Sequence, residues 1–537
     1  MMSKLICSSV ILLWLAGSAS CATLYVDGAV SSSGDGTSWG TALKTIQEGI
    51  DSASAGDTVV VARGNYHQNI AFKGKNIVLT SEDPGSPFVV DGTRIIASQP
   101  GSVVTFLGTE NVTCALIGFT ITNGDEEYGG GIFGGGVADH TQARIRNNVI
   151  TGNSAGLSGG GIAFCDGLIQ NNTITGNSAG VDGGGLYDCG GTIEYNTITE
   201  NDAGGRGGGI SICHGTIRRN TVRGNLACRG GGLHGCLGSI QFNTISHNQA
   251  ASSPGETWGG GLYDCNGTVS YNRIQQNSAA TYGGGMYGCD GPIRNNLILG
   301  NRAISGGGID LCGGTVENNT IVGNTAMMDG GGGGLTWRTG SVRNCIIWGN
   351  TGPLGDPDDV DGSNNVTFSC FGEFSLAEGN INQNPWFVDP DGPDNDPETY
   401  DDNNYRLLSF LGIVSPCIDS GKNEDWMWEA FDLDGDFRVF QGSSSLTVDM
   451  GAYEHGSPRF EIVKIEKPPF SRVQCKLTWN TRPGDTCVVW SRPRFPTGRM
   501  IIPWTEEATV VSEGETTSWT DAVMSPQKKF YRVELRR

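Results

Sequence analysis

Two consecutive stretches, GGGIAFCDGLIQNNTITGNSAGVD at residues 159–182 and GGGLYDCGGTIEYNTITENDAGGR at residues 183–206, decide the fold of this chain. Each begins with three glycines and an apolar residue, and each carries Asn-Thr-Ile-Thr-x-Asn at the same later position. The apolar residue after a glycine triplet recurs at Ile132, Ile162, Leu186, Ile210, Leu233, Leu262, Met286, Ile309 and Leu335. The steps between these residues are 30, 24, 24, 23, 29, 24, 23 and 26, which indicates an internal repeat.

Paired asparagines recur with the same period. Eight copies of Asn-x-(Ile/Val)-x-x-Asn or its close variants begin at Asn148, Asn172, Asn196, Asn220, Asn243, Asn272, Asn296 and Asn319, and a ninth, from Asn344 to Asn350, is one residue longer. Two-helix repeats need more than 30 residues and cannot be built from glycine triplets and Thr-Ile-Thr. The β-branched phrases are typical of strands, and the glycines and asparagines are typical of turns.

Three short strands and three turns fill a repeat of this length and close one rung of a right-handed, three-faced parallel β-helix. Rungs then hydrogen-bond to each other at about 4.8 Å, so equivalent residues stack in columns. We expect each asparagine to adopt a left-handed turn conformation and to donate its amide to the next asparagine in the column. The apolar residue after each glycine triplet should point into the core. The two longest steps predict loops at Ala138–Arg144 and Ala250–Thr257.

Cysteine forms a third column, always three residues after the apolar position: Cys165, Cys189, Cys213, Cys236, Cys265, Cys289 and Cys312. Metal binding and redox chemistry are one interpretation, but there is no Cys-x-x-Cys pair and the spacing is that of the rungs. Disulfides between neighbouring rungs would be strained. We therefore interpret these residues as buried free thiols that fill the core.

Composition restricts the possible ligands. The 537 residues include 35 Lys+Arg and 56 Asp+Glu, a net charge of −21, which argues against a nucleic-acid partner and favours cations or neutral glycans. Residues 351–457 hold 22 acidic and three basic residues, a net charge of −19. Residues 458–537 hold nine acidic and 14 basic residues, a net charge of +5. Such shifts mark domain boundaries.

The N-terminal residues 1–22 are typical of a signal peptide, because a short apolar run from Val10 is followed by small residues. Cys21 leaves a lipoprotein open as the alternative. No later segment is long and apolar enough for a transmembrane helix. Residues 23–123 should form the N-terminal cap and first rungs, with an amphipathic helix within Thr41–Ser54 that closes the open end of the core, and residues 124–350 the repeats.

Several motifs resemble known families. Gly118-Phe119-Thr120-Ile121-Thr122-Asn123-Gly124 followed by Gly-Gly-Gly-Ile resembles the secreted parallel β-helix proteins of the pectin-lyase-like superfamily, and the repeats also resemble those of chlamydial polymorphic outer-membrane proteins. The phrases Asn384-Pro385-Trp386-Phe387-Val388-Asp389, Ser415-Pro416-Cys417-Ile418-Asp419-Ser420-Gly421, Asp432-Leu433-Asp434-Gly435-Asp436 and Val448-Asp449-Met450-Gly451-Ala452-Tyr453 resemble the choice-of-anchor Q domain. The resemblance to β-helix proteins implies a fold and export. The resemblance to the choice-of-anchor Q domain implies a secreted or cell-surface bacterial protein.

No catalytic motif of that superfamily is recognisable. Its lyases use Arg or Lys as the base beside Ca²⁺ held by aspartates, and its glycosidases use clustered aspartates, but the repeats lack those groupings. The candidate ligand-binding residues are instead the outward side chains Tyr187, His234, Tyr263 and Tyr287, with Arg206 and Arg229 facing an acidic sugar. Ordinary exposed strand residues are the alternative. We expect binding or structural work on polysaccharide or other cell-surface components, with a polysaccharide lyase or glycoside hydrolase as the alternative.

The acidic segment is a candidate Ca²⁺ site. Its alternating aspartates are Asp389, Asp391, Asp394 and Asp396, and then Asp432, Asp434 and Asp436 around a glycine turn. The closing glutamate of an EF-hand loop is missing, so a solvated loop or a network with Arg438 is the alternative. Residues 458–537 predict a small β-sandwich module. In an exported protein Cys475 can pair with Cys487, and Cys370 with Cys417.

Overall fold

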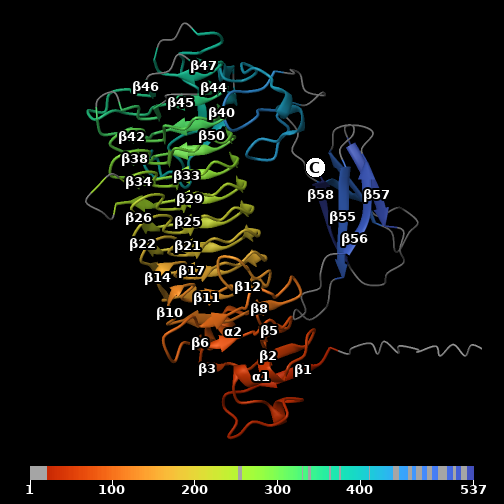
Figure 1. Ribbon diagram of the computed structural model, residues 1–537. Coiled ribbons are helices and arrows are strands. Elements are labelled where there is room, and N and C mark those ends of the chain that lie inside the picture. Colours follow the sequence, from red (N-terminus) through yellow and green to blue (C-terminus); the bar gives the residue numbers. More distant parts are fainter. Residues whose placement is uncertain are drawn as a thin grey trace, which may run out of the picture.

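The chain winds as a parallel β-helix in the computed structural model, which describes residues 21–456 apart from 252–254, 256, 329–330, 337–339, 362–364, 374–376, 411 and 440–446, and the strands between 462 and 536. Strands stack along one axis, each in parallel with the equivalent strands of the neighbouring turns (Figure 1). The predicted three-faced β-helix is confirmed. Among the described residues its faces are sheets of 14, 13 and 12 strands, which we name A, B and C, and a nine-stranded ladder D follows sheet B.

Sheet A consists of β1 (Thr23–Val26), β2 (Thr58–Val61), β5 (Val78–Ser81), β8 (Ala115–Ile117), β12 (Arg144–Arg146), β16 (Ile169–Gln170), β20 (Ile193–Glu194), β24 (Ile217–Arg218), β28 (Ile240–Gln241), β32 (Val269–Ser270), β36 (Ile293–Arg294), β40 (Thr315–Glu317), β44 (Ser341–Arg343) and β47 (Val366–Thr367). Sheet B consists of β3 (Gly64–His67), β6 (Thr93–Ile96), β9 (Thr120–Thr122), β13 (Val149–Thr151), β17 (Thr173–Thr175), β21 (Thr197–Thr199), β25 (Thr221–Arg223), β29 (Thr244–Ser246), β33 (Arg273–Gln275), β37 (Leu297–Leu299), β41 (Thr320–Val322), β45 (Ile346–Trp348) and β48 (Cys370–Phe371).

Sheet C consists of β4 (Ile70–Ala71), β7 (Val104–Thr105), β11 (Ile132–Phe133), β15 (Ile162–Ala163), β19 (Leu186–Tyr187), β23 (Ile210–Ser211), β27 (Leu233–His234), β31 (Leu262–Tyr263), β35 (Met286–Tyr287), β39 (Ile309–Asp310), β43 (Leu335–Thr336) and β46 (Val360–Asp361). Ladder D consists of β10 (Asp125–Tyr128), β14 (Ser154–Ser158), β18 (Ser178–Ala179), β22 (Asp202–Ala203), β26 (Leu226–Ala227), β30 (Gln249–Ala250), β34 (Ser278–Ala279), β38 (Arg302–Ala303) and β42 (Thr325–Ala326).

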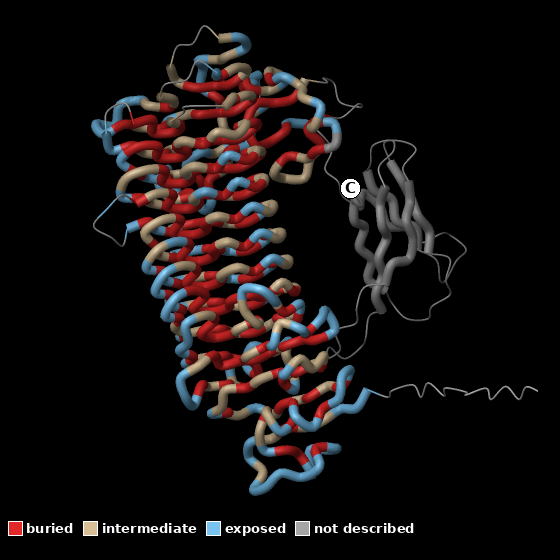
Figure 2. The backbone as a smooth tube through the Cα atoms, in the orientation of Figure 1, coloured by how far each residue is buried: buried red, intermediate tan, exposed pale blue. Residues whose placement is uncertain are grey.

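The interior is a continuous apolar column. Figure 2 shows buried residues in red in successive turns along the coil. In a single rung the side chains of Ile169, Ile174 and Leu186 come from sheets A, B and C and are all fully buried. The seven cysteines of the repeat lie in this core as free thiols. Burial raises the pKa of Cys213, for example, which keeps its thiol protonated and unreactive.

The two asparagine columns hold successive rungs in register. Asn172 donates its side-chain amide to Oδ1 of Asn196 at 3.0 Å and to the carbonyl of Ile145 at 2.9 Å. Its backbone N–H donates to the same Oδ1 of Asn196 at 2.9 Å. Each buried amide therefore bonds to the rung above and the rung below, which satisfies polar groups that burial would otherwise penalise. The predicted stacking of asparagines is confirmed.

The prediction that these asparagines adopt the left-handed conformation was wrong. The residue before each of them has the positive φ: Asn171 precedes Asn172 with a φ of 56°, and Gly176 precedes Asn177 with a φ of 62°. This difference explains the longer ninth copy. Asn344 occupies the left-handed corner with a φ of 54°, and Cys345 takes the column position, where the Asn319 amide approaches its sulfur.

The N-terminal end of the coil is capped as predicted. Helix α1 (Ile46–Ser52) buries Ile46 and Ile50 against β1, β2 and β4, within the expected range Thr41–Ser54. Thr45 and Glu48 form a reciprocal capping box at its start. A 3₁₀ turn η1 (Trp39–Thr41) precedes it, and a second helix, α2 (Pro87–Gly92), follows β5.

The coil continues beyond residue 350, the predicted end of the repeats. Strands β46, β47 and β48 add one more strand to each of sheets C, A and B. Asp359 takes the asparagine position in this last rung and accepts both N–H groups of Asn350 at 2.9 Å. Strands within residues 351–371, the first part of the acidic segment, therefore belong to the coil.

The rest of the acidic segment packs on the last rungs through β49 (Phe387–Asp389), β50 (Asn404–Leu407), β51 (Ser409–Phe410), β52 (Ile413–Val414) and the 3₁₀ turn η2 (Asp425–Glu429). Tyr400 lies directly over Gly300 and Gly323, where a Cβ would collide with its ring and with its hydroxyl oxygen, respectively. Its hydroxyl donates to the carbonyl of Gly323 at 3.1 Å. Glycine at these two corners is thus required for docking of the acidic segment.

The C-terminal residues form two three-stranded antiparallel sheets, in agreement with the predicted small β-sandwich. One contains β53 (Ile462–Glu466), β54 (Cys475–Asn480) and β57 (Thr516–Asp521), and the other β56 (Thr505–Val511), β55 (Thr486–Pro493) and β58 (Lys529–Arg536). Cys475 and Cys487 lie on strands of different sheets, β54 and β55. Their side chains lie outside the described part of the chain, so their disulfide stays a prediction. Residues 1–20 of the predicted signal peptide also lie outside it.

Candidate functional site

The predicted ligand-binding tyrosines lie on the outer face of sheet C. Tyr187 is in register with Ser211, Ser211 with His234, His234 with Tyr263, and Tyr263 with Tyr287. One outward position per rung thus forms a column along the coil. Tyr187, Tyr263 and Tyr287 are partly exposed on it.

Two aromatic residues that the sequence analysis did not select complete this face. Trp258 stacks on Tyr287 with ring centroids 5.5 Å apart and an interplanar angle of 18°, and it contacts Tyr263 at 5.7 Å. Tyr282 contacts Tyr287 at 6.0 Å. Trp258 and Tyr282 each stand directly before a glycine triplet. Arg206 and Arg229 occupy the same position on the two rungs before that of Trp258. Aligning that position across the repeats would have identified both.

Arg206 and Arg229 lie on consecutive rungs beside the aromatic residues. Neither forms an ion pair with a carboxylate in the described part of the chain. The Arg229 guanidinium lies over the ring of Trp258, 4.1 Å from its centroid. Both arginines, together with Asp182, line a cavity of about 440 Å³. We call Arg206, Arg229, Trp258, Tyr263 and Tyr287 the Arg–Trp face.

The structure buries His234, one of the predicted ligand-binding residues. It is only 5% exposed, its Nδ1 lies 2.9 Å from the Ser211 hydroxyl oxygen, and its ring stacks on Tyr263 at 5.3 Å. Burial lowers the pKa of His234, so the ring is neutral at pH 7. His234 therefore supports Tyr263 from below and is not placed to contact a ligand itself.

A histidine and two aspartates meet farther toward the N-terminus. His140, on the loop after β11, places Nδ1 3.0 Å from Oδ1 of Asp166 and Nε2 3.9 Å from Oδ2 of Asp188. Phe164 packs on the His140 ring, with centroids 5.2 Å apart. Burial raises the pKa of Asp188, although His140 opposes this effect. The predicted loop Ala138–Arg144 thus contributes an ionisable side chain that its spacing did not reveal.

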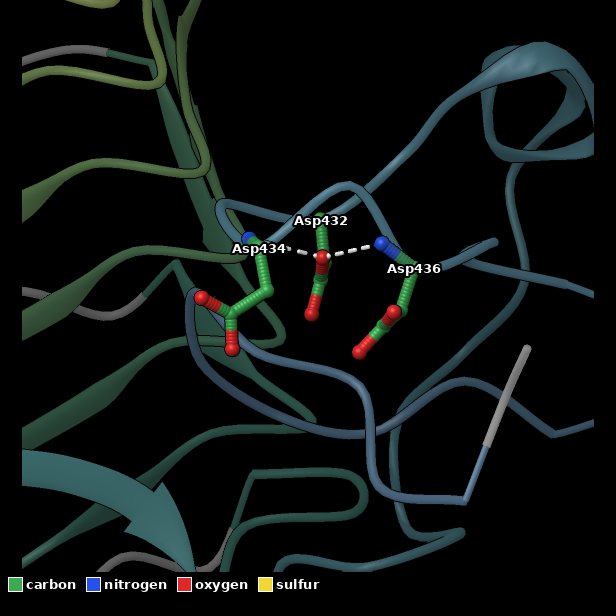
Figure 3. A group of neighbouring side chains, drawn as sticks. All are labelled: Asp432, Asp434 and Asp436. Atoms are coloured by element: carbon green, nitrogen blue, oxygen red, sulfur yellow. Dashed lines mark hydrogen bonds between the residues drawn. The ribbon is translucent and has the colours of Figure 1, made fainter. Parts of the chain in front are cut away.

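The acidic turn at the other predicted site is tightly bonded within the protein. Asp432, Asp434 and Asp436 bring one oxygen each within 4.8 Å of the others, and among the described residues they are the one such cluster. Figure 3 shows Asp432 between its two neighbours, whose backbone N–H groups both donate to its Oδ1, at 2.9 and 2.7 Å. Arg406 binds both oxygens of Asp434, at 2.5 and 2.6 Å.

These bonds leave a cation little access to the turn, because Arg406 already neutralises Asp434. The donor set therefore fits a protein-internal network better than a metal centre. The other predicted ligands, Asp389, Asp391, Asp394 and Asp396, do not come together as a group in the described structure. Asp394 and Asp396 instead accept bonds from their own loop, for example from Thr399.

A buried ionic cluster lies behind this turn. Arg438 is fully buried and donates to Glu454 at 3.3 Å and to the carbonyl of Gly451 at 2.7 Å. Burial raises the pKa of Asp432 to about 6, that of Asp449 to about 7, and that of Glu454 well above its usual value. Three carboxyl groups share one arginine, so their protonation must depend on pH.

Cys370 and Cys417 lie together in one apolar cluster between the last rung and the acidic segment. Both are fully buried free thiols, and a hydrogen bond between their sulfur atoms raises the pKa of Cys417. The structure thus places the predicted partners in contact, and their oxidation stays a prediction.

Comparisons with known proteins concern the fold alone. The crystal structure of pectate lyase Pel9A is 16% identical, over 81% of this chain and 96% of that chain, with a TM-score of 0.37. The complex of XylC with xylose is 11% identical, over 68% of this chain and 87% of that chain, with a TM-score of 0.31. No protein-family model and no curated protein sequence matches this chain. No helix of the described structure is long and apolar enough to cross a membrane.

Proposed function

We propose that this is an exported bacterial β-helix protein that binds acidic polysaccharide through the Arg–Trp face. The observation that supports this best is the pair Arg206 and Arg229, two guanidinium groups on consecutive rungs without a carboxylate partner in the described structure. Guanidinium groups bind carboxylates and sulfates in a bidentate manner. Arg206 is exposed and Arg229 is partly exposed beside the Trp258 ring, although the chain has a net charge of −21. Such a pair is suited to an anionic, ring-shaped ligand.

The aromatic residues supply the second half of the recognition. Side chains on neighbouring rungs are about 4.8 Å apart, so Trp258, Tyr263 and Tyr287 present a ladder of apolar surface along the coil. Such rings contact the apolar faces of sugars while their polar tips remain in water. A polymer lying parallel to the coil axis would meet charged and aromatic groups in succession.

Export and surface attachment are part of the same proposal. Residues 1–22 would direct secretion, Cys21 offers a lipid attachment site as an alternative, and the choice-of-anchor Q resemblance suggests a cell-surface or secreted protein. The C-terminal sandwich would then act as a spacer, sorting element or binding module.

A glycan array tests the proposal. The wild-type protein should bind acidic glycans, and the double variant Tyr263→Ala/Tyr287→Ala should lose that binding without a lower melting temperature. Tyr195→Ala, which removes an exposed tyrosine from another corner of the coil, is the matched control. The proposal is contradicted if no acidic glycan on the array binds, or if the double variant binds as the wild type does.

Polysaccharide cleavage is the second candidate, favoured by the contact of His140 with Asp166 and Asp188. A histidine between two carboxylates can exchange a proton with a substrate in acid–base catalysis. A panel of acidic polysaccharides, with and without Ca²⁺, should then give unsaturated products or new reducing ends that His140→Gln abolishes. Absence of both products with every polymer would leave binding as the function.

Calcium binding at Asp432, Asp434 and Asp436 also remains a proposal, and it requires that the ion displace Arg406 from Asp434. If the ion is structural, EDTA lowers the melting temperature by several degrees. No shift with EDTA would mean that the arginine alone stabilises the turn.

A further inference from the structure

A cleft of about 930 Å³ separates the last rungs of the coil from the docked acidic segment. One side consists of Arg302, Trp348 and Gly349 from the coil, and the other of Trp386, Glu398 and Tyr400 from the acidic segment. We call it the C-terminal cleft. Its volume lies in the range of ligand-binding pockets. It shares none of the residues of the Arg–Trp face.

Two tryptophans remain accessible at this cleft. Trp386 is 47% exposed, and Trp348 is partly buried. Trp386 also has a φ of 47°, a conformation that costs energy for a bulky residue. Large aromatic side chains that stay at least partly exposed on both sides of a concave surface are typical of ligand-binding sites.

Glycine keeps the cleft open on the coil side. The second asparagine of each repeat phrase, such as Asn277, is preceded by a corner residue in the left-handed conformation. Gln276 occupies this corner with a φ of 51°. Gly349 holds the same corner beside the cleft with a φ of 66°, and a Cβ there would meet nothing within 4 Å. The backbone at Gly349 is therefore open to a ligand although the conformation does not require glycine.

Charge selects the class of ligand. Two acidic side chains, Asp391 and Glu398, line the cleft, whereas Arg302 is its one basic lining residue. The two acidic residues belong to the segment 351–457, which has a net charge of −19. This field repels uronates and other anions. Carboxylates accept hydrogen bonds from hydroxyl groups, and tryptophan rings pack on the apolar faces of sugar rings. We propose that the C-terminal cleft binds a neutral oligosaccharide, separately from the acidic polysaccharide on the Arg–Trp face.

Calorimetric titration of the full-length protein with cellohexaose, xylohexaose and mannohexaose tests this inference. At least one of these should bind, and Trp386→Ala and Gly349→Gln should each weaken that binding tenfold or more. Two matched controls should bind as wild type. Trp428→Ala removes a tryptophan that is 43% exposed outside the cleft, and Gly224→Gln makes the same change at the equivalent corner of a distant rung.

The outcomes separate this site from the Arg–Trp face. The double variant Arg206→Gln/Arg229→Gln should keep its affinity for the neutral hexasaccharide even if it loses an acidic one. The inference is wrong if none of the three neutral sugars binds. It is equally wrong if Trp428→Ala weakens binding as much as Trp386→Ala, or if tetramethylammonium competes for the site, which would indicate a cation-binding aromatic cage instead.

Discussion

At the scale of single residues, the buried asparagines show how one side chain can define a fold. Asn201 donates to the carbonyl of Ile174 and to Oδ1 of Asn225, both at 3.0 Å, while its own Oδ1 accepts two N–H groups of Asn177. A buried residue with bonds to both neighbouring rungs cannot be replaced without leaving several polar groups unpaired.

We therefore predict that Asn201→Ala destabilises the rungs around it. Each buried polar group left without a partner costs about 1–3 kcal/mol, so exchange of the Asn177 amide should accelerate on the order of tenfold or more. Hydrogen exchange followed by mass spectrometry measures this. Ser178→Ala, at an exposed neighbouring position, should leave exchange unchanged, and similar exchange in both variants would contradict the role of the asparagine column.

The buried carboxyl groups make stability depend on pH. The pKa of Asp449 is raised from 3.8 to about 7, so its protonated form favours the folded state. This contribution is complete below about pH 4 and is lost as the pH rises through about 7. We expect the melting temperature to fall between pH 5 and pH 8, and less so for Asp449→Asn, which cannot ionise. A decline of equal slope in both proteins would exclude Asp449 as its source.

At the scale of elements, the acidic segment is the part that sequence periodicity could not place. Its residues lack a repeat, and the contacts that dock it, such as Tyr400 over two glycine corners, join residues far apart in the sequence. By contrast, columns of Ile, Cys and Asn could be predicted because identical residues at a fixed period report on stacking directly.

The candidate site divides in the same way. Tyr263 and Tyr287 could be predicted because they hold one position of the repeat. His140 could not, since its loop interrupts the period. Trp258 holds the same position before a glycine triplet as Arg206 and Arg229, so an alignment of the repeats could have identified it. The left-handed corners were assigned one residue too late. Asparagine tolerates that conformation, but the asparagines here are buried and use their side chains for hydrogen bonds between rungs, while the preceding residue forms the corner.

The contact between Cys370 and Cys417 predicts a covalent link between the last rung and the acidic segment. In an exported protein these neighbouring thiols should oxidise to a disulfide, whereas the repeat cysteines remain free. Peptide mapping under non-reducing conditions should recover the two cysteines in one cross-linked pair, and reduction should lower the melting temperature by several degrees. Recovery of both as free thiols after oxidative refolding would contradict this prediction.

At the scale of the whole molecule, the coil places equivalent residues of successive rungs at regular intervals along its axis. The Arg–Trp face and the C-terminal cleft share no residue, and we expect their opposite charge environments to suit different sugars. Binding to two glycans would let a secreted or surface-attached protein bridge polymers.

Calorimetric titration of hexagalacturonate and hexaguluronate against the Arg–Trp face tests this account most directly. The wild-type protein should bind at least one of them, more weakly as salt screens the two guanidinium groups. Arg206→Gln/Arg229→Gln should lose tenfold or more in affinity, about 1.4 kcal/mol, while Arg223→Gln, on an exposed position of β25, should not. Equal affinities for the double variant and the wild type, or binding of neither sugar, would contradict it.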